Sequence, residues 1–298
     1  YNQFKSIGAL VDKKVVELSS RPAFHCMGKT ISFGELDRLT RAFGAWLQSK
    51  GYGKGARVAL MMPNCLQYPV ALYGTLRAGG IVVNVNPLYT ARELEHQLKD
   101  SGAEVIVILE NFANTLEEVL SKTPVKHIIV ASLGDMLGVK GMIVNFVVRN
   151  VKKMVPAFQL PAAKRFNEVL SEAAGLELKP VAVGHDDIAF LQYTGGTTGV
   201  SKGAMLLHRN ILANIEQMDV WLLSGLKGEP GMIITALPLY HIFSLTVNCL
   251  LMMKCGGCNI LITNPRDIPG FIKELGKHRY NMITGVNTLF NALIHHPD

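Results

Sequence analysis

The sequence contains no long apolar run and no dense cluster of basic residues. Its longest apolar stretch, residues 242–253, is about a dozen residues long and includes Ser, Thr and Asn. That length suits a buried core helix, because a helix that crosses a bilayer needs about 20 apolar residues. The Lys and Arg residues are scattered along the chain rather than gathered in an arm. Their distribution argues against nucleic acid as a partner.

Charged residues are also few, at 18% of the chain against 49% hydrophobic residues. This balance excludes an intrinsically disordered chain and predicts a globular protein with a large core. The net charge of +7 is compatible with an anionic partner such as a nucleotide, CoA or anionic lipid. A solvated surface with a modest basic excess is the simpler interpretation, and composition alone favours it.

Cysteine is present but does not form a disulfide framework. The five cysteines are Cys26, Cys65, Cys249, Cys255 and Cys258. An odd number in a long chain indicates a reducing compartment. Cys255 and Cys258 have the spacing of a redox motif, but no second pair completes a zinc site. We therefore expect inert core thiols.

Short apolar runs alternate with helix-length segments along most of the chain. The runs that we predict as strands are 57–62, 81–85, 104–110, 127–132, 187–194, 232–237, 259–263 and 282–285. Helices are expected to begin near His208, His241 and Ile268. Strand–helix alternation predicts an α/β fold, and two runs of four strands suggest two doubly wound, mostly parallel sheets with flanking helices.

Segment 141–160 interrupts this rhythm. On a helix, Asn145, Arg149, Lys152 and Lys153 share one narrow face, and apolar side chains cover the rest. A wide apolar face with a narrow basic one is typical of a helix that lies on a membrane surface. A helix docked on the protein's own core, with its basic residues facing water, is the alternative, and both stay open.

The segment with the most specific pattern is 193–204, between a predicted strand and the helix that begins near His208. Its residues are Tyr193, Thr194, Gly195, Gly196, Thr197, Thr198, Gly199, Val200, Ser201, Lys202, Gly203 and Ala204. Glycines let successive backbone amides turn toward an anion. Hydroxyl groups can donate to phosphate oxygens, and Lys202 adds a mobile positive charge. The pattern predicts a phosphate-binding loop, and an ordinary glycine-rich turn is the less specific alternative.

This loop is not a Walker A motif. That motif places Ser or Thr directly after Gly-Lys at the start of a helix, whereas Lys202 is followed by Gly203. The order Tyr-Thr-x-Gly-Thr-Thr-Gly-x-x-Lys-Gly instead resembles the signature loop of the adenylate-forming superfamily. Segments 236–245 and 72–90 are similar to two further motifs of that family. The amino-acid sequence over the whole chain resembles the bacterial long-chain fatty-acid–CoA ligases in particular.

The resemblance implies a two-step reaction with ATP, a fatty acid and CoA as substrates. The carboxylate would attack the α-phosphorus of ATP, and the CoA thiol would then displace AMP from the acyl-adenylate. In this family the loop residues, here 193–204, would hold the β- and γ-phosphates, with Thr197 as a contact to Mg²⁺. His241 would line the carboxylate and adenylate region. Leu245 stands where some long-chain members carry a gating aromatic residue, so a gate of that kind is not expected.

Several motifs of the family cannot be matched within residues 1–298. They are the adenine-binding motif, the ribose-binding aspartate, the hinge and the lysine that drives adenylation. We therefore expect the N-terminal portion of an AMP-binding domain that is inactive alone, with subdomains over 56–205 and over 1–55 plus 206–298. The C-terminal barrel part and the small catalytic-lysine domain would lie outside it. Exposed apolar surface would then favour self-association as a homodimer.

Three other functions remain as alternatives. An adenylating ligase for aryl, amino or short-chain acids would carry the same loop, because the loop contacts only ATP. A P-loop hydrolase is disfavoured by the missing Gly-Lys-Ser/Thr. A nucleotide- or membrane-binding module without turnover would also match a chain of this extent. The expected location is the cytoplasm, with peripheral attachment to the inner face of the membrane as an open question.

Overall fold

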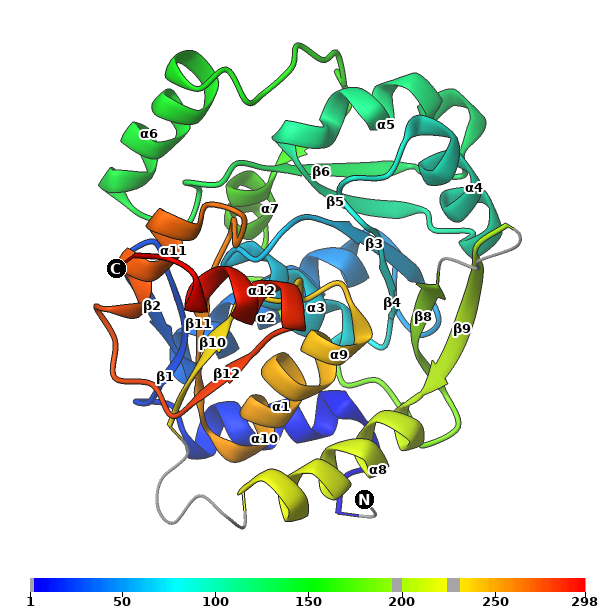
Figure 1. Cartoon of the computed structure of the whole chain (residues 1–298). Coiled ribbons are helices and arrows are strands. Elements are labelled where there is room, and N and C mark those ends of the chain that lie inside the picture. The colour runs from blue at the N-terminus through cyan, green and yellow to red at the C-terminus, as the bar shows by residue number, and fades with distance from the viewer. Residues whose placement is uncertain (1–2, 195–199, 224–230, 298) are drawn as a thin grey trace.

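The computed structural model describes residues 3–194, 200–223 and 231–297, which form two β-sheets with helices packed around them (Figure 1). The larger sheet has seven strands in the order β7-β6-β5-β3-β4-β8-β9. Its strands are β3 (Arg57–Met61), β4 (Ile81–Asn84), β5 (Val105–Leu109), β6 (His127–Ala131), β7 (Lys164–Arg165), β8 (Ile188–Thr194) and β9 (Lys202–Leu207). All neighbours in it pair in parallel except β8 and β9.

The smaller sheet has five strands in the order β12-β10-β11-β1-β2. They are β1 (Pro22–Cys26), β2 (Lys29–Ser32), β10 (Met232–Thr235), β11 (Cys258–Leu261) and β12 (Met282–Thr284). The antiparallel hairpin of β1 and β2 joins the parallel strands through the pairing of β1 with β11. The tight turn of this hairpin uses Met27 and Gly28, both with positive φ, as the twist of a two-residue hairpin requires.

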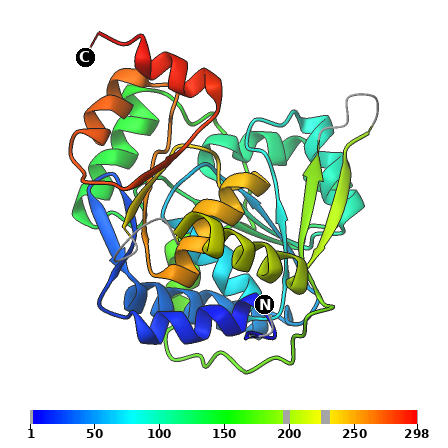
Figure 2. The same ribbon diagram turned by 60° about the horizontal axis from the view of Figure 1, so that its bottom comes forward.

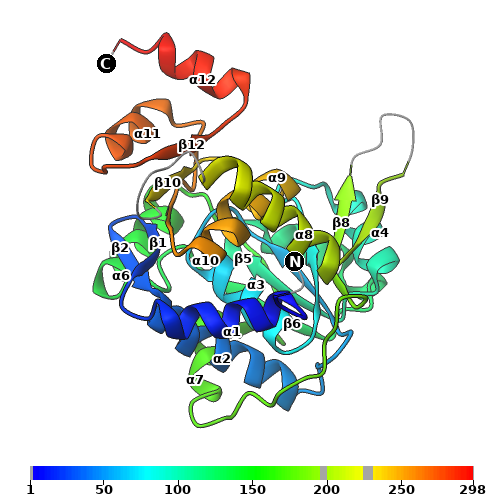
Figure 3. The same ribbon diagram turned by 90° about the horizontal axis from the view of Figure 1, so that it is seen from below.

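Helices cover both faces of the larger sheet and part of the smaller one (Figures 2 and 3). They are α1 (Ile7–Glu17), α2 (Phe33–Ser49), α3 (Gln67–Arg77), α4 (Ala91–Ser101), α5 (Ala113–Val119), α6 (Val139–Phe146), α7 (Phe166–Glu172), α8 (His208–Met218), α9 (Ile242–Ser244), α10 (Met252–Cys255), α11 (Ile268–Leu275) and α12 (Asn287–Ile294). Three π-helical segments extend them, namely η3 (Val147–Val151), η4 (Asp219–Leu223) and η5 (Leu245–Leu251).

Helix α3 lies at the centre of the largest apolar core, and all of its residues are buried. It packs closely on α2, where a Cβ at Gly74 would lie 2.8 Å from the Phe43 ring. A Cβ at Gly44 would lie 2.9 Å from the backbone oxygen of Gly74. Glycine at both positions therefore permits the two helices to approach, and the pair supports the inner face of the larger sheet.

The predicted α/β fold with two mostly parallel sheets is confirmed. Each of the eight predicted strands is present, and helices begin at His208, just after His241, and at Ile268. One grouping was wrong: the strand at 187–194 was counted with the second run, but β8 pairs with β4 in the larger sheet. Strands β1, β2, β7 and β9 were not predicted. β2 and β7 are only four and two residues long, β1 contains Pro22 and His25, and β9 has no buried residue.

The five thiols are free, as expected, and four of them are buried. Burial raises the pKa of Cys26 to about 11 and the pKa of both Cys255 and Cys258 to about 12. A thiol with such a pKa is almost entirely protonated at neutral pH, and the thiolate is the reactive form. Cys255 and Cys258 therefore have the spacing of a redox motif but not its reactive thiolate.

Candidate active site

The predicted phosphate loop connects the two strands of a β-hairpin. Thr194 at the end of β8 pairs with Lys202 at the start of β9, and Tyr193 pairs with Gly203. The loop residues Gly195, Gly196, Thr197, Thr198 and Gly199 lie outside the described residues, so their expected contacts with phosphate and Mg²⁺ stay predictions. Thr194, Val200, Lys202 and Ala204 are exposed on the hairpin, which leaves the Lys202 ammonium accessible to an anion.

Tyr193 stabilises the base of this hairpin. Its hydroxyl donates to a carboxylate oxygen of Asp100 on α4 over 2.6 Å. Burial and this carboxylate raise the pKa of Tyr193 well above its ordinary value. Its ring lies against Gly203, where an added Cβ would come within 2.8 Å of two ring carbons. Gly203 is therefore needed for a close approach of strand and ring at the base of the loop.

Ser201 links the end of β8 to the residue that precedes β9. Its hydroxyl donates to the backbone oxygen of Thr194 over 3.0 Å, and its own backbone oxygen lies 2.9 Å from Nε2 of His96 on α4. The two ends of the loop are thus joined to each other and to α4.

His241 begins the other candidate segment. Its ring Nδ1 accepts from the backbone N–H of Phe243 over 3.4 Å, and so His241 caps α9 while its side chain stays exposed. The preceding residue, Tyr240, is half-buried, and burial raises its pKa. An exposed imidazole at a helix N-terminus is accessible to an anionic ligand.

A buried polar network holds these two segments together. Gln192, which directly precedes the segment 193–204, donates to the backbone oxygen of Tyr240 over 2.8 Å and accepts from Asn84 over 3.0 Å. The hydroxyl of Tyr68 lies 2.6 Å from Oδ1 of Asn84 and 3.0 Å from the backbone oxygen of Leu239. The carboxyl ends of β4 and β8 in one sheet are thereby bonded to the segment that follows β10 in the other.

Asn64 adds a second link between the sheets. Its amide nitrogen donates to the backbone oxygens of Thr235 and Leu237 over 2.9 and 3.0 Å, and its Oδ1 accepts from the N–H of Leu239 over 2.8 Å. Sequence reasoning missed this asparagine and the Tyr68, Asn84 and Gln192 network. The available signal was an amide side chain inside an apolar strand, since Asn84 and Gln192 interrupt buried runs and a buried amide needs partners.

A largely apolar cavity of about 810 Å³ opens beside Tyr240. Its wall includes Pro238 and Tyr240 from the His241 segment, Ile262 and Phe271 near α11, and Val147 of η3. Volumes of about 300–1,000 Å³ are typical of small-molecule pockets. The cavity can therefore accept an apolar group next to the segment that carries His241.

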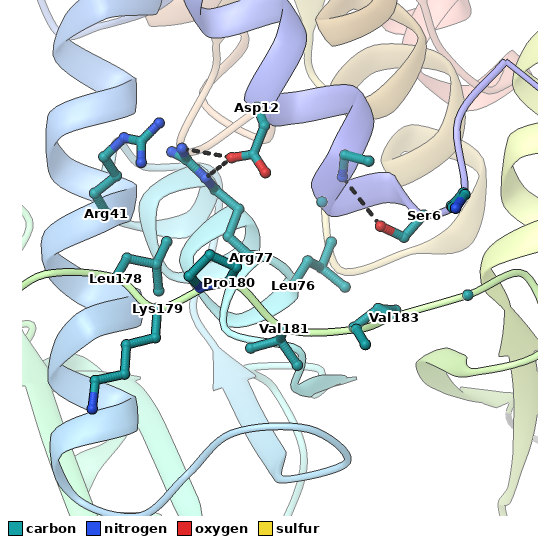
Figure 4. A pocket seen from close by; sticks show the side chains of 15 residues that line it. Ser6, Asp12, Arg41, Leu76, Arg77, Leu178, Lys179, Pro180, Val181 and Val183 are labelled. Carbon is teal, nitrogen blue, oxygen red and sulfur yellow. Dashed lines mark hydrogen bonds and ion pairs between the residues drawn. The ribbon is translucent and has the colours of Figure 1, made fainter.

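A separate hollow of about 590 Å³ lies between α1, α2 and the segment 178–184 (Figure 4). Its most buried cation, Arg77, already lies 2.7 Å from Asp12 and 2.8 Å from Asp37. Because both partners are carboxylates, the guanidinium is neutralised within the protein. The Arg77 ion pairs link the helices around this cavity, and Arg77 is therefore less available to an anion than the exposed Lys202.

His208 does not face the loop. It is buried, and its Nδ1 accepts from the backbone N–H of Ile7, the first residue of α1, over 3.1 Å. The bond satisfies an N–H at the start of α1 and links α8 to that helix. Burial lowers the pKa of His208 to about 4, which keeps the ring neutral and able to accept that bond.

Comparison with known proteins identifies the family of the chain. The model of the family described as AMP-binding enzyme matches residues 11–298. The chain belongs to the AMP-binding enzyme family.

Several curated relatives share more than half of their aligned residues with the chain. A long-chain-fatty-acid–CoA ligase of Escherichia coli O6:H1 is 55% identical over 300 residues, which cover 100% of this chain and 53% of the relative. One from Haemophilus influenzae is 54% identical over 298 residues, covering 98% and 53%. The AMP-binding chain thus spans about half the length of the curated relatives it matches.

Solved structures of AMP-binding enzymes share its fold. The anthranilate–CoA ligase AuaEII in complex with anthranoyl-AMP superposes with a TM-score of 0.83 at 17% identity, over 99% of this chain and 52% of that one. A long-chain-fatty-acid–CoA ligase from Archaeoglobus fulgidus gives 0.76 at 23% identity, over 97% and 53%. At these identities the likeness shows the fold alone.

Proposed function

We propose that residues 1–298 form the phosphate-binding half of an AMP-forming long-chain fatty-acid–CoA ligase. We expect this half to be inactive without the remainder of the enzyme. The observation that carries the proposal is the bond from Gln192 to the Tyr240 backbone. It holds the loop expected to bind ATP next to the segment expected to contact the acyl group. The relatives named as long-chain ligases, at 54–55% identity, support this substrate class.

The reaction would begin when the fatty carboxylate attacks the α-phosphorus of ATP and pyrophosphate leaves. The CoA thiol would then attack the acyl carbonyl of the adenylate, giving acyl-CoA and AMP. In the first step the protein positions two anions and neutralises developing charge. Loop amides and hydroxyls of 193–204, with the exposed Lys202, would hold the β- and γ-phosphates, and His241 would face the carboxylate.

Magnesium would support this binding by neutralising charge on the phosphates. The loop offers hydroxyl oxygens, including that of Thr194 at the exposed end of β8. Oxygen donors shared with substrate phosphates suit Mg²⁺. Thr197 is the residue that we propose as its contact.

The apolar cavity beside Tyr240 supports a fatty tail over a polar acid. Its lining combines Pro238, Ile262 and Phe271 with the half-buried Val147. An adenylating ligase for aryl, amino or short-chain acids remains the alternative within the same fold. A nucleotide-binding module without turnover is the alternative from another class.

Analysis of the nucleotide products tests the reaction class. The protein at the full length of its relatives would receive Mg-ATP, palmitate and CoA, and AMP, ADP, pyrophosphate and phosphate would be measured separately. We expect AMP and pyrophosphate in equal amounts, only with palmitate present, and no palmitoyl-CoA from residues 1–298 alone. ADP and phosphate would instead identify a hydrolase, and ATP binding without any product would identify a binding module.

We also propose peripheral attachment to the cytoplasmic face of the membrane through α6 and η3. Two polar residues of this segment bond to the rest of the protein: Asn145 accepts from the N–H of Gly134 over 2.8 Å, and Arg149 binds Glu110 and Ser132. Large apolar side chains face outward, namely Val139, Met142, Ile143, Phe146, Val151 and Met154. An exposed apolar face next to Lys152 and Lys153 suits an anionic bilayer surface. None of the helices in the described part of the chain combines the length and apolar character that a bilayer crossing requires.

Vesicle sedimentation tests the attachment. The double variant Met142→Asp/Phe146→Asp should bind anionic vesicles at least tenfold more weakly than the parent protein. The control, Val16→Asp/Leu176→Asp, changes two exposed apolar residues elsewhere and adds the same charge. Equal weakening by both double variants would show a charge effect and contradict attachment through α6.

A further inference from the structure

Three potential metal ligands converge where β1 and α11 lie, at the end of the molecule away from the hairpin of β8 and β9 (Figure 1). They are His25 on β1 and the pair Glu274 and His278 on and just after α11. Their nearest ligand atoms all lie within 4.8 Å of one another. Helix α11 ends at Leu275, and the turn that follows brings the His278 ring to 3.0 Å from the Glu274 carboxylate.

The spacing of these atoms fits a small divalent ion. Oε1 of Glu274 lies 3.0 Å from Nε2 of His278 and 3.7 Å from Nε2 of His25. A tetrahedral zinc ion with bonds of about 2.0–2.2 Å holds its ligand atoms roughly 3.4 Å apart. The two observed separations bracket that value, so an ion could enter with only small side-chain movements.

Neighbouring groups already orient two of the ligands. Nδ1 of His25 lies 2.7 Å from the hydroxyl of Thr30 on β2, which leaves Nε2 directed at the cluster. Lys277 binds Oε2 of Glu274 over 2.6 Å, which leaves Oε1 for the ion. Hydrogen bonds of this kind to the outer atoms of metal ligands are typical of metal sites.

The ligands are sheltered but accessible. The exposed fractions of the His25, Glu274 and His278 side chains are 17%, 19% and 14%. Glu274 also lines the cavity of about 810 Å³, which provides a path for an ion and room for a water as a fourth ligand. The positive charges of Lys277 and Lys140 near the cluster oppose a cation, so binding depends on the three direct ligands.

We propose that His25, Glu274 and His278 form a zinc site that joins β1 to α11. Two imidazoles and one carboxylate are a ligand set suited to Zn²⁺, whereas Mg²⁺ and Ca²⁺ prefer oxygen ligands alone. The site is distinct from the proposed magnesium contact in the loop. Its ligands are about 250 residues apart in sequence, so the ion would clamp α11 onto the hairpin of β1 and β2.

Calorimetric titration of the purified, metal-free protein with Zn²⁺ tests the site. We expect one equivalent to bind and the melting temperature to rise with Zn²⁺ but not with Mg²⁺. His278→Ala and Glu274→Gln should each weaken binding at least tenfold. Co²⁺ in place of Zn²⁺ should give the visible absorption of a tetrahedral site in the parent protein and not in His278→Ala.

Two controls keep the result decisive. His295→Ala/His296→Ala removes two histidines near the C-terminal end of the described chain and should leave zinc binding unchanged. Thr30→Val should weaken zinc binding while the melting temperature in EDTA stays that of the parent, because Thr30 only positions His25. Absence of zinc binding overturns the proposal, and so does binding that survives both ligand variants or disappears with the two C-terminal histidines. A simple hydrogen-bonded cluster would give the first of these results.

Discussion

Single polar residues in apolar surroundings determine how the candidate site is built. Gln192, Asn84, Asn64 and Tyr68 are buried, and each uses its side chain to bond a segment from the other sheet or a neighbouring strand. An unpaired buried polar group costs about 1–3 kcal/mol. These residues therefore fix the position of the His241 segment relative to the loop.

Substitution of Lys202 tests whether its ammonium group contacts a phosphate of ATP. We expect Lys202→Ala to raise the KM for Mg-ATP in the full-length enzyme by about tenfold or more, because one charge-assisted bond contributes about 1.5–3 kcal/mol. Lys179→Ala is the control, since Lys179 is also exposed but lies in the segment 178–184. Steady-state kinetics measure both, and an unchanged KM in Lys202→Ala would exclude a phosphate contact.

His208 predicts a pH dependence of stability. Its folded-state pKa of about 4 lies below the ordinary value of 6.5 because of burial, against the attraction of Asp187 and with the repulsion of His185 and Lys54. The unfolded state therefore binds the extra proton between these values, so the free energy of unfolding is full above pH 6.5 and falls as the pH drops toward 4. Between pH 7 and pH 5 the free energy of unfolding should fall by about 2 kcal/mol because of His208.

Urea unfolding at both pH values measures this effect. His208→Gln keeps an acceptor for the Ile7 N–H but cannot titrate, so its stability should fall by about 2 kcal/mol less than that of the parent over this range. The same pH dependence in both proteins would show that His208 titrates normally in the folded state.

At the scale of elements, the loop hairpin and α6 show where sequence patterns are sufficient and where they are not. The apolar run of β8 and the start of α8 were predictable from the sequence. The strand β9 was not, since it pairs antiparallel with β8 and its exposed residues Lys202, Ala204 and Met205 do not form a buried run. Pairing with a neighbour, rather than burial, makes it a strand.

The orientation of α6 was likewise beyond the sequence. The sequence left the role of its basic face open, and the structure divides that face: Arg149 of η3 binds the buried Glu110, whereas Lys152 and Lys153 are exposed. The decisive group is that carboxylate, which comes from the end of β5, far away in sequence. A helical pattern identifies two faces and cannot say which one the rest of the protein contacts.

The contact between Arg149 and Glu110 can be measured. Arg149→Ala should lower the free energy of unfolding by about 1–3 kcal/mol, because Glu110 loses its bidentate partner at 2.8 and 3.0 Å. Arg165→Ala removes a more distant partner at 3.3 Å and should cost less. Urea unfolding compares the two, and an equal effect would mean that Arg149 does not anchor η3.

At the scale of the whole molecule, the two sheets depend on side chains that cross between them. Gln192→Leu should lower the free energy of unfolding by about 2 kcal/mol or more, because it removes the partner of the Asn84 amide nitrogen and of the Tyr240 carbonyl inside the protein. Gln48→Leu also removes two hydrogen bonds, but they are exposed ones to Lys179, and it should cost about 1 kcal/mol or less.

The same variant reports on function. If the network aligns the two segments, Gln192→Leu should also raise the KM for both ATP and fatty acid in the full-length enzyme. A loss of stability with unchanged kinetics would limit Gln192 to a structural role.

Most strands of the fold were predictable, because buried parallel strands have continuous apolar runs. How the two sheets are held against each other was not predictable. That relation depends on Asn64, Tyr68 and Gln192, whose partners are 40 or more residues away. The loop was recognisable from the unusual density of Gly, Thr and Lys over 193–204. The ligand cluster of His25, Glu274 and His278 could not be found in the sequence, because only the fold brings β1 beside α11.

The most direct test of the central claim is acid-dependent exchange of labelled pyrophosphate into ATP by the full-length enzyme. The acid would range from acetate through octanoate to palmitate, with benzoate as the aryl comparison. We predict exchange that rises steeply with chain length and is weak with acetate and benzoate. Exchange that is fastest with benzoate or acetate would keep the adenylating reaction and contradict the long-chain substrate, and no exchange with any acid would contradict the adenylating reaction itself.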